Sequence, residues 1–192
     1  LRPQQLTATV EDNLSRLRLE QLPLVHLRVM ESTDVPFADS LGALAGLQRA
    51  GKIRHIGLSN VTLEQIQAAQ RTTRIASVQN LYNLIDRRDE AVVDYCTDQG
   101  IPFMPYFPLA VGNLGNETGP LTPMAQRHQA TPAQIALAWL LARSPQVVLI
   151  PGTSTVAHLE ENIAAAAIQL GEEEYRELAE NPDIAALPSF RA

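Results

Sequence analysis

Hydrophobic positions follow two alternating patterns along the chain. Segments with apolar residues at three- and four-residue spacing predict amphipathic helices, and the short, nearly all-apolar runs between them predict buried strands. The predicted helices cover residues 6–17, 38–50, a segment that begins after Thr62, 88–99, a segment from Thr131 through Leu141, 155–168 and 172–181. The predicted strands cover residues 22–27, 53–58, 75–79, 101–106 and 147–150.

Local signals mark where several of these helices begin and end. Thr62 and Gln65 have the spacing of a capping box, as do Thr131 and Gln134, so each pair predicts a helix start. Glycine follows the predicted helix 38–50 at Gly51, where a left-handed residue commonly ends a helix.

The alternation of helices with apolar strands predicts an α/β fold with a parallel sheet covered by helices. Periodicity leaves open whether the sheet is doubly wound or is part of a (β/α)8 barrel. A complete barrel takes about 250 residues and eight strands, whereas this pattern has five. If the fold is a barrel, the chain holds its last part. With 192 residues and no linker-like composition, residues 1–192 are expected to form a single domain.

Composition and charge narrow the class of protein. The chain has 45% apolar residues, a net charge of −6 and a pI near 5.2, which argues against broad contact with nucleic acid phosphates. Neither a membrane-spanning run nor a basic-then-apolar leader is visible in the sequence, and the single cysteine, Cys96, fits a reducing compartment. A cytoplasmic protein is therefore expected, with Cys96 in the core.

Ordered motifs carry a resemblance to a known family. They are Ala50–Asn60, Val78–Asn83, Tyr106–Leu109, Ile150–Thr155 and Leu159–Asn162. In order and spacing, these motifs resemble those of the aldo-keto reductases. The resemblance implies a TIM barrel, represented here by roughly its last five strands and their helices. It also implies NAD(P)H-dependent reduction of small aldehydes or ketones to alcohols, with NADP(H), possibly NAD(H), as cofactor.

The resemblance assigns roles to residues at the nicotinamide end of the site. Ser59, Asn60 and Gln79 correspond to the family's carboxamide-binding groups, which suits the donor and acceptor character of a carboxamide. Tyr106 corresponds to the tyrosine that stacks on the nicotinamide ring. His26 matches the catalytic histidine that orients the substrate carbonyl, a task that a neutral imidazole can perform.

A second group of residues is implied for the remainder of the cofactor. This group consists of Pro108, Leu109, Gly152, Thr153, Ser154, Thr155, His158, Glu161 and Asn162. The loop that contains Gly152–Thr155 leads into a helix whose N-terminal N–H groups attract phosphate. Many family members carry a lysine and an arginine for the 2′-phosphate where this chain has Gly152 and His158. A strict preference for NADPH is therefore not expected.

Part of the family's chemistry has no counterpart in the sequence. The resemblance implies a proton-donating tyrosine, a lysine and an aspartate on earlier strands, and nothing in residues 1–20 matches them. The only lysine, Lys52, is expected at the opposite face of the barrel. Three explanations compete: an N-terminal part outside this sequence, which we favour, a truncated gene product, or completion of the barrel by another chain. The alternative functions are a nicotinamide-binding regulatory or interaction subunit and an inactive remnant.

Three further segments have simple interpretations. The glycine-rich stretch 111–120 is expected to be either a surface loop or a flap over the pyrophosphate. The charge run Asp86–Asp89 is expected to be a solvated turn. No histidine spacing suits a metal site, so none is predicted. The sequence does not determine the oligomeric state or the identity of the substrate.

Overall fold

The structure is a computed structural model that describes residues 2–30 and 34–189. It consists of two compact units. Unit 1 comprises Leu1–Asn80 and Asp98–Pro102, and unit 2 comprises Leu81–Thr97 and Phe103–Ala192.

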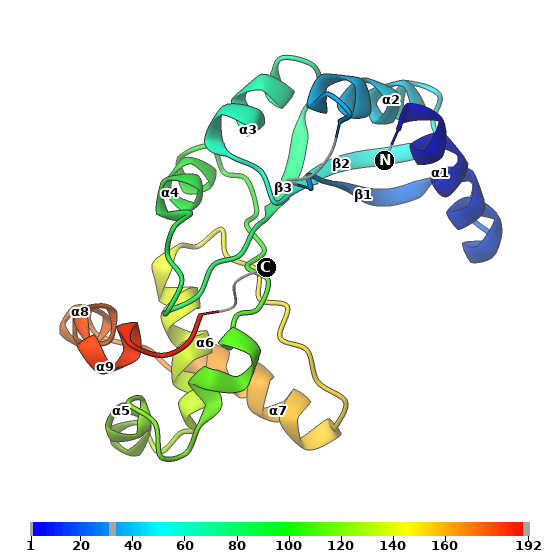
Figure 1. Cartoon of the computed structure of the whole chain (residues 1–192). Helices are drawn as coiled ribbons and strands as arrows, with labels where there is room; N and C mark the ends of the chain where they lie inside the picture. Colours follow the sequence, from blue (N-terminus) through cyan, green and yellow to red (C-terminus); the bar gives the residue numbers. More distant parts are fainter. Residues whose placement is uncertain (1, 31–33, 190–192) are drawn as a thin grey trace. The chain divides into compact units, whose positions relative to one another are not determined.

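Unit 1 is a parallel sheet covered by helices. Its elements in chain order are α1 (Pro3–Leu17), β1 (Leu22–Arg28), α2 (Phe37–Arg49), β2 (Ile53–Ser59), α3 (Leu63–Gln70) and β3 (Ile75–Gln79). The three strands lie in the order β1-β2-β3, and both pairs are parallel. Helix α2 packs on β1 and β2, α1 packs on α2, and α3 packs on β3 (Figure 1). The predicted helix–strand alternation is confirmed over this unit.

The central strand forms the core of unit 1. Ile53, Ile56 and Leu58 of β2 are at most 1% exposed, and Leu44 of α2 is equally buried. A strand with neighbours on both edges and a helix on one face loses contact with water over most of its length, and within β2 only Arg54 and His55 stay exposed. This packing holds the end of β2 in place, where several candidate residues lie.

The capping box predicted at Thr62 is present in the structure. The Thr62 hydroxyl accepts a hydrogen bond from Gln65 N at 3.3 Å, and Gln65 Oε1 accepts one from Thr62 N at 2.9 Å. The same reciprocal pair forms between Thr131 and Gln134. Both boxes satisfy N–H groups that the first helical turn leaves without partners.

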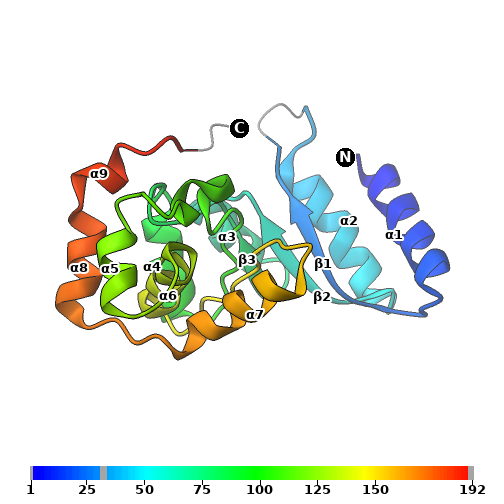
Figure 2. The same cartoon turned by 90° about the horizontal axis from the view of Figure 1, so that it is seen from below.

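The later part of the chain is mostly helical (Figure 2). Its elements are α4 (Glu90–Asp98), η1 (Ala110–Gly115), α5 (Thr122–Arg127), α6 (Pro132–Arg143), α7 (Val156–Ala164), η2 (Ala165–Ala167), α8 (Glu172–Glu180) and α9 (Pro182–Ala185). Among the described residues, no helix combines the length and the apolar character that crossing a membrane requires.

Aromatic rings form the core of unit 2. The indole of Trp139 is buried and stacks on the ring of Tyr175, with centroids 5.1 Å apart, and on that of Tyr82 at 6.1 Å. Phe103 meets the Tyr82 ring edge-on. Aromatic pairs in these geometries contribute beyond the area that they bury. The stack therefore fixes α6 against α8 and against the segment that contains Tyr82.

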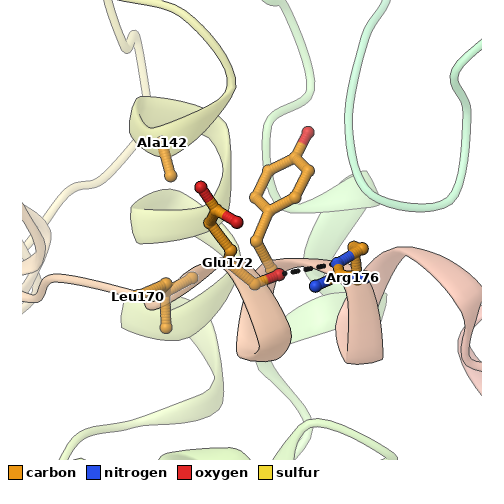
Figure 3. A pocket seen from close by; sticks show the side chains of 5 residues that line it. Ala142, Leu170, Glu172 and Arg176 are labelled. Carbon is orange, nitrogen blue, oxygen red and sulfur yellow. Dashed lines mark hydrogen bonds between the residues drawn. The ribbon is translucent and has the colours of Figure 1, made fainter.

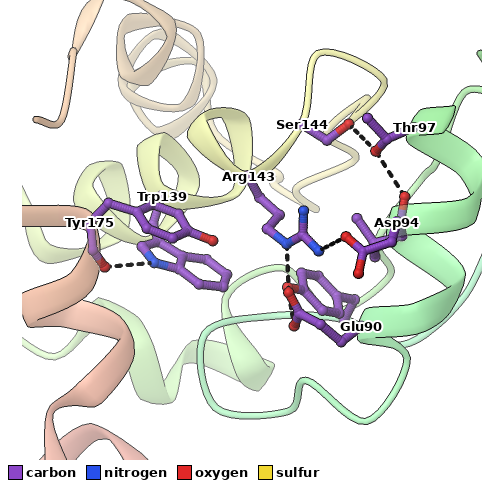
Figure 4. A network of polar contacts seen from close by, with 9 residues as sticks. Glu90, Asp94, Thr97, Trp139, Arg143, Ser144 and Tyr175 are labelled. Carbon is purple, nitrogen blue, oxygen red and sulfur yellow. Dashed lines mark hydrogen bonds and ion pairs between the residues drawn. The ribbon is translucent and has the colours of Figure 1, made fainter. Parts of the chain in front are cut away.

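A polar network continues this core (Figure 4). The Arg143 guanidinium donates to carboxylates of Glu90 and Asp94, and the buried Tyr82 hydroxyl donates to Glu90 at 2.8 Å. Burial and the neighbouring Glu90 carboxylate raise the pKa of the Tyr82 hydroxyl, so it stays protonated as a donor. The network ties α4 to α6.

Two predicted strands do not form continuous ladders. A parallel bridge joins Phe103 to Val147, one residue from each predicted strand. A second bridge joins Tyr106 to Leu81, which lies outside both segments. The prediction of strands over both ranges is wrong in extent. Two of the residues in 101–106 are prolines, which lack the N–H that a ladder needs.

The stretch 111–120 begins inside the 3-10 helix η1 and continues as turns. Val111 and Gly112, with φ of 57° and 92°, interrupt the regular geometry of η1. Helices α5 and α9 were not predicted either, because each is too short to show a full hydrophobic period.

The Thr62 cap generates a stability prediction. Replacing Thr62 with alanine removes the side-chain acceptor for Gln65 N, so the free energy of unfolding should fall by about 1 kcal/mol. Urea denaturation measures this change. Thr7→Ala is the matched control, because the Thr7 hydroxyl only bonds back to the Pro3 carbonyl within α1. If both substitutions had the same effect, the cap would contribute nothing.

Candidate functional site

Two candidate residues of unit 1 are neighbours at the carboxyl end of the sheet. Ser59 and Gln79 are directly paired in the parallel ladder between β2 and β3, so their side chains point to the same face. Ser59 is 2% exposed, and its Oγ has no hydrogen-bond partner among the described residues. A buried hydroxyl without a partner is costly. This atom therefore fits a place where a ligand amide or carbonyl completes the hydrogen bonding.

Asn60 joins the ends of the three strands. Its backbone is left-handed, with φ 58°, and its N–H donates to the Gln79 carbonyl at 3.0 Å. Its Nδ2 donates to the Val29 carbonyl at 2.8 Å. The Asn60 amide therefore aligns the strand ends that carry Ser59 and Gln79, a role that sequence reasoning did not assign to it.

Asn80 is a residue of this region that sequence reasoning missed. It is 2% exposed, its Oδ1 accepts from Val61 N at 3.0 Å, and its Nδ2 donates to the Val61 carbonyl at 2.7 Å. The amide thus pairs with both backbone groups of one residue and closes the end of β3 onto the start of α3. Its position directly after Gln79, in the motif Val78–Asn83, was the available signal.

His26 reaches across the sheet to β3. Its Nε2 lies 2.9 Å from the Ser77 Oγ, and either atom can be the donor, depending on the tautomer. Between them lies Gly57, which pairs with His26 in the ladder. A Cβ at Gly57 would stand 2.5 Å from His26 Cδ2 and 2.8 Å from Ser77 Oγ, so only glycine leaves room for this contact. Burial lowers the pKa of the His26 imidazole, which favours the neutral form.

In unit 2, Tyr106 lies beside the chain segment that follows β3. It forms a parallel bridge with Leu81, and its ring meets the Phe107 ring edge-on with centroids 5.5 Å apart. Tyr106 is half-buried, Pro108 is buried and Leu109 is half-buried. The Tyr106 ring is thus supported by neighbours and still partly open to solvent.

The loop before α7 is exposed throughout Gly152–Thr155. Thr155 caps the helix, since its hydroxyl accepts from His158 N at 3.2 Å, and the Thr153 hydroxyl accepts from Thr155 N at 3.3 Å. The Thr153 hydroxyl donates its hydrogen to the Thr155 carbonyl at 3.3 Å. The Thr155 hydroxyl hydrogen and the remaining N–H groups of the first turn suit an anion.

Three candidate residues share one face of α7. His158, Glu161 and Asn162 stand at i, i+3 and i+4 spacing, which brings side chains together on a helix. His158 and Glu161 are exposed and Asn162 is half-buried. Gln134 of α6 holds this helix by donating to the Glu161 carbonyl at 3.0 Å. Helix α7, which carries these three residues, begins directly after the loop of Gly152–Thr155.

Other groups lie away from the candidate residues. Lys52 precedes β2, at the end of the sheet opposite Ser59, as the sequence interpretation expects, and it pairs with Glu11, which was not predicted. Over residues 2–30 and 34–189, no cluster of His, Cys, Asp and Glu is arranged to hold a metal ion.

A pocket of about 340 Å³ lies between α6 and α8, and none of the candidate residues lines it (Figure 3). Its lining residues are Ala142, Leu170, Glu172, Tyr175 and Arg176.

Comparisons with known proteins agree with the motifs. A family model described as "Aldo/keto reductase family" matches residues 1–181. The chain is 46% identical over 176 residues to pyridoxine 4-dehydrogenase of Escherichia coli (strain K12), with 89% of the chain and 61% of the relative covered. It is 41% identical to an uncharacterised oxidoreductase of Schizosaccharomyces pombe, with 93% of the chain and 58% of the relative covered. The chain therefore spans about three fifths of the length of these curated relatives.

Solved structures show the same likeness. A thermostable aldo-keto reductase in complex with the inhibitor epalrestat matches with a TM-score of 0.84 and 35% identity, over 94% of this chain and 67% of that one. An aldo/keto reductase from Klebsiella pneumoniae in complex with NADP and acetate matches with a TM-score of 0.76 and 31% identity, over 89% and 62%.

Gly57 generates a prediction about the His26–Ser77 contact. Gly57→Ala should destabilise the protein by about 1–3 kcal/mol, because the added methyl overlaps the imidazole and the Ser77 hydroxyl. Thermal or urea unfolding measures the change. Gly42→Ala in α2 is the matched control, since a Cβ there meets nothing within 4 Å and should be neutral or stabilising. Equal effects at both positions would contradict the close approach at Gly57.

The lowered pKa of His26 generates a pH prediction. Between that depressed pKa and the ordinary value near 6.5, the unfolded chain binds more protons at this residue than the folded chain. The free energy of unfolding should therefore fall as the pH is lowered through this interval, and His26→Gln should remove that part of the slope. Urea midpoints from pH 7 to pH 5 measure it. His55→Gln, at an exposed histidine of the same sheet, is the control. An unchanged slope in His26→Gln would refute the assignment.

Proposed function

Because the chain belongs to the aldo/keto reductase family, we propose that the whole protein is an NAD(P)H-dependent oxidoreductase that reduces aldehydes or ketones to alcohols. The fold class of the family, a (β/α)8 barrel, is as the motifs implied, and the parallel sheet of unit 1 is part of it. The chain covers 61% of its relative pyridoxine 4-dehydrogenase, so this activity is proposed for the complete protein.

The observation that carries the proposal is the unpartnered hydroxyl of Ser59. It is buried at the carboxyl end of β2, directly paired with Gln79, in the region where α/β barrels place their active sites. Ser59 Oγ and the Gln79 amide together offer the donor and acceptor groups that a nicotinamide carboxamide needs. Asn60 keeps these two groups in register by joining the strand ends.

The other candidate residues suit the remaining parts of the same reaction. Tyr106 would support one face of the nicotinamide ring, with Pro108 and Leu109 beside it. When bound, the reduced cofactor supplies the hydride. His26, in its neutral form, would donate a hydrogen bond from Nδ1 to the substrate carbonyl and so orient it, while the Ser77 hydroxyl donates to Nε2 and holds the ring in place.

The cofactor phosphates would bind at the start of α7. Thr153, Ser154 and Thr155 offer hydroxyls there, and Gly152 lets the backbone approach closely. His158, with Glu161 and Asn162 on the same helix face, would then lie near the adenosine. Since a histidine lacks the fixed charge and fork of arginine, the preference for NADPH over NADH should be modest.

The proton donor of the reaction is proposed to lie outside this sequence. Lys52 is at the opposite end of the sheet and is paired with Glu11, so it is not a candidate. We propose that the two units act as one domain in the complete protein. We also propose that the protein is cytoplasmic, acts on a small carbonyl compound and has no nucleic acid partner, in accord with its single cysteine and net charge of −6.

A second candidate function is nicotinamide binding without efficient turnover, as in a regulatory subunit. The two functions share the cofactor and differ in turnover.

The proposal is tested by cofactor binding and then by turnover. Titration of the complete protein should show binding of NADPH and of NADH, with affinities within about tenfold of each other. Ser59→Ala should weaken both, since it removes the hydroxyl assigned to the carboxamide, by about tenfold. Absence of binding of either nucleotide would overturn the proposal.

Two further variants sharpen this experiment. His158→Arg should strengthen binding of NADPH more than that of NADH, because a guanidinium binds a phosphate through two parallel hydrogen bonds. Ser40→Ala, at a buried serine of α2 far along the chain from the strand ends, is the control for Ser59→Ala. In the complete protein, loss of NADPH absorbance with a panel of aldehydes and ketones indicates a reductase, whereas tight binding without loss indicates the regulatory function.

A further inference from the structure

A buried asparagine follows Tyr82 in unit 2 and has no role in the function proposed above. Asn83 is 2% exposed, and its Oδ1 accepts from Ile85 N at 3.0 Å and from Asp86 N at 2.9 Å. Its own N–H donates to the Asp86 carbonyl at 3.0 Å. These bonds fold residues 83–86 into a tight Asx turn.

The same side chain holds the residue after Tyr106. Asn83 Nδ2 donates to the Phe107 carbonyl at 3.0 Å, and that carbonyl also accepts from Ala110 N at 2.9 Å. Phe107 is left-handed, with φ 53°. A bulky residue in this conformation is strained, so the surrounding contacts must hold it there. Phe107 is bonded to Tyr106, and the two rings meet edge-on with centroids 5.5 Å apart, so the conformation of Phe107 fixes a neighbour against which the Tyr106 ring packs.

The strain continues beyond this residue. Ala110 and Val111 are also left-handed, with φ of 47° and 57°. Three such residues other than glycine within five positions form a segment that would relax without outside support. The side chain of Asn83 supports the first of these three residues, because its Nδ2 donates to the Phe107 carbonyl.

The turn also pairs an arginine with the buried carboxylate of Asp86. Asp86 is 6% exposed and accepts hydrogen bonds from Arg88 Nε at 2.9 Å and from Arg88 Nη2 at 2.5 Å. The expectation of a solvated turn over 86–89 is therefore wrong at Asp86, because the Asn83 turn and Arg88 compensate its burial. The Asp86 carboxylate raises the pKa of Arg88, and Tyr106 is among the groups that interact electrostatically with this guanidinium.

The base of this arrangement is rigid. Tyr82, the residue before Asn83, is fully buried, stacks on Trp139 and donates to Glu90. Leu81 forms the parallel bridge to Tyr106. The segment 81–83 is therefore anchored to the core of unit 2 on one side and contacts residues 106–107 on the other.

We propose that Asn83 is the positioning residue for Tyr106, and that its amide fixes the tyrosine ring against the nicotinamide by holding Phe107 in its left-handed conformation. The inference rests on the function proposed above. Asn83 itself acts through Phe107 and touches neither cofactor nor substrate. Its effect should accordingly be confined to the nicotinamide end of the cofactor.

The test compares two nucleotides that differ in the nicotinamide. In the full chain, Asn83→Ala should weaken the binding of NADPH about tenfold, because the Phe107 carbonyl loses a buried hydrogen bond and the tyrosine loses its support. Binding of adenosine 2′,5′-bisphosphate, which lacks the nicotinamide, should stay within twofold of the unsubstituted chain. Fluorescence titration measures both.

Asn181→Ala is the matched control. Asn181 caps α9 by accepting from the N–H groups two and three residues ahead, the same pattern as Asn83. It should leave the binding of both nucleotides unchanged.

Substitutions at Phe107 test whether its left-handed backbone supports cofactor binding, and they leave Asn83 in place. Phe107→Gly and Phe107→Ala both remove the ring, but only glycine adopts a left-handed backbone without strain. Glycine should therefore retain NADPH binding several-fold better than alanine, and the difference should widen in the Asn83→Ala background. This comparison decides the matter even if Asn83→Ala alone fails to fold.

The outcomes separate the inference from the proposed function. Equal weakening of NADPH and adenosine 2′,5′-bisphosphate in Asn83→Ala would show a general structural role and overturn the inference. Unchanged NADPH binding in that variant, or no difference between glycine and alanine at residue 107, would do the same. If the unsubstituted protein bound no NADPH, the proposed function would be wrong. The proposed role of Asn83 in cofactor binding would then be wrong as well.

Discussion

Parallel pairing of β1, β2 and β3 is the constraint on which the candidate site depends. In a parallel ladder all strands end at the same edge, so residues far apart in the chain come together there without any special contact. Ser59 pairs with Gln79 for this reason, and His26 lies over Gly57 and reaches Ser77. The buried apolar residues of β2 keep the ladder in register, since a slip of one residue would turn every side chain to the other face.

Buried polar groups around the candidate residues are nearly all satisfied from within the chain. Asn60 and Asn80 in unit 1, and Asn83 in unit 2, each use a side-chain amide to hold backbone that no regular ladder or helix pairs. Such amides rigidify a polar region because every bond made avoids a large desolvation penalty. Against this background the Ser59 hydroxyl stands out, and for that reason it carries more weight for ligand binding than an exposed hydroxyl would.

Local features were predictable where the physics is local. The Thr62 and Thr131 capping boxes appear as expected, because each needs only residues within one helical turn. The strands of unit 1 were predicted within one or two residues, since each of them carries buried apolar residues within a short run. The strands over 101–106 and 147–150 failed because apolar composition alone does not show which N–H groups find partners. The charge of Asp86 led to the prediction of a solvent-exposed turn. The carboxylate is buried instead, because Arg88 donates two hydrogen bonds to it and the Asx turn of Asn83 holds its backbone.

By itself, the sequence determined the alternation of helices and strands, the capped helix starts and the motifs that identify the family. Those depend on side-chain chemistry at short spacing, which is written directly in the order of residues. Only the tertiary structure decided that Gly57 makes room for the His26–Ser77 contact, that Ser59 Oγ is buried without a partner, and that Asn83 supports a strained Phe107. The contacts at Gly57 and at Asn83 join residues that lie about 20 or more positions apart, and the burial of Ser59 Oγ depends on neighbouring strands. Such features are set by packing and strand register, which no short stretch of sequence contains.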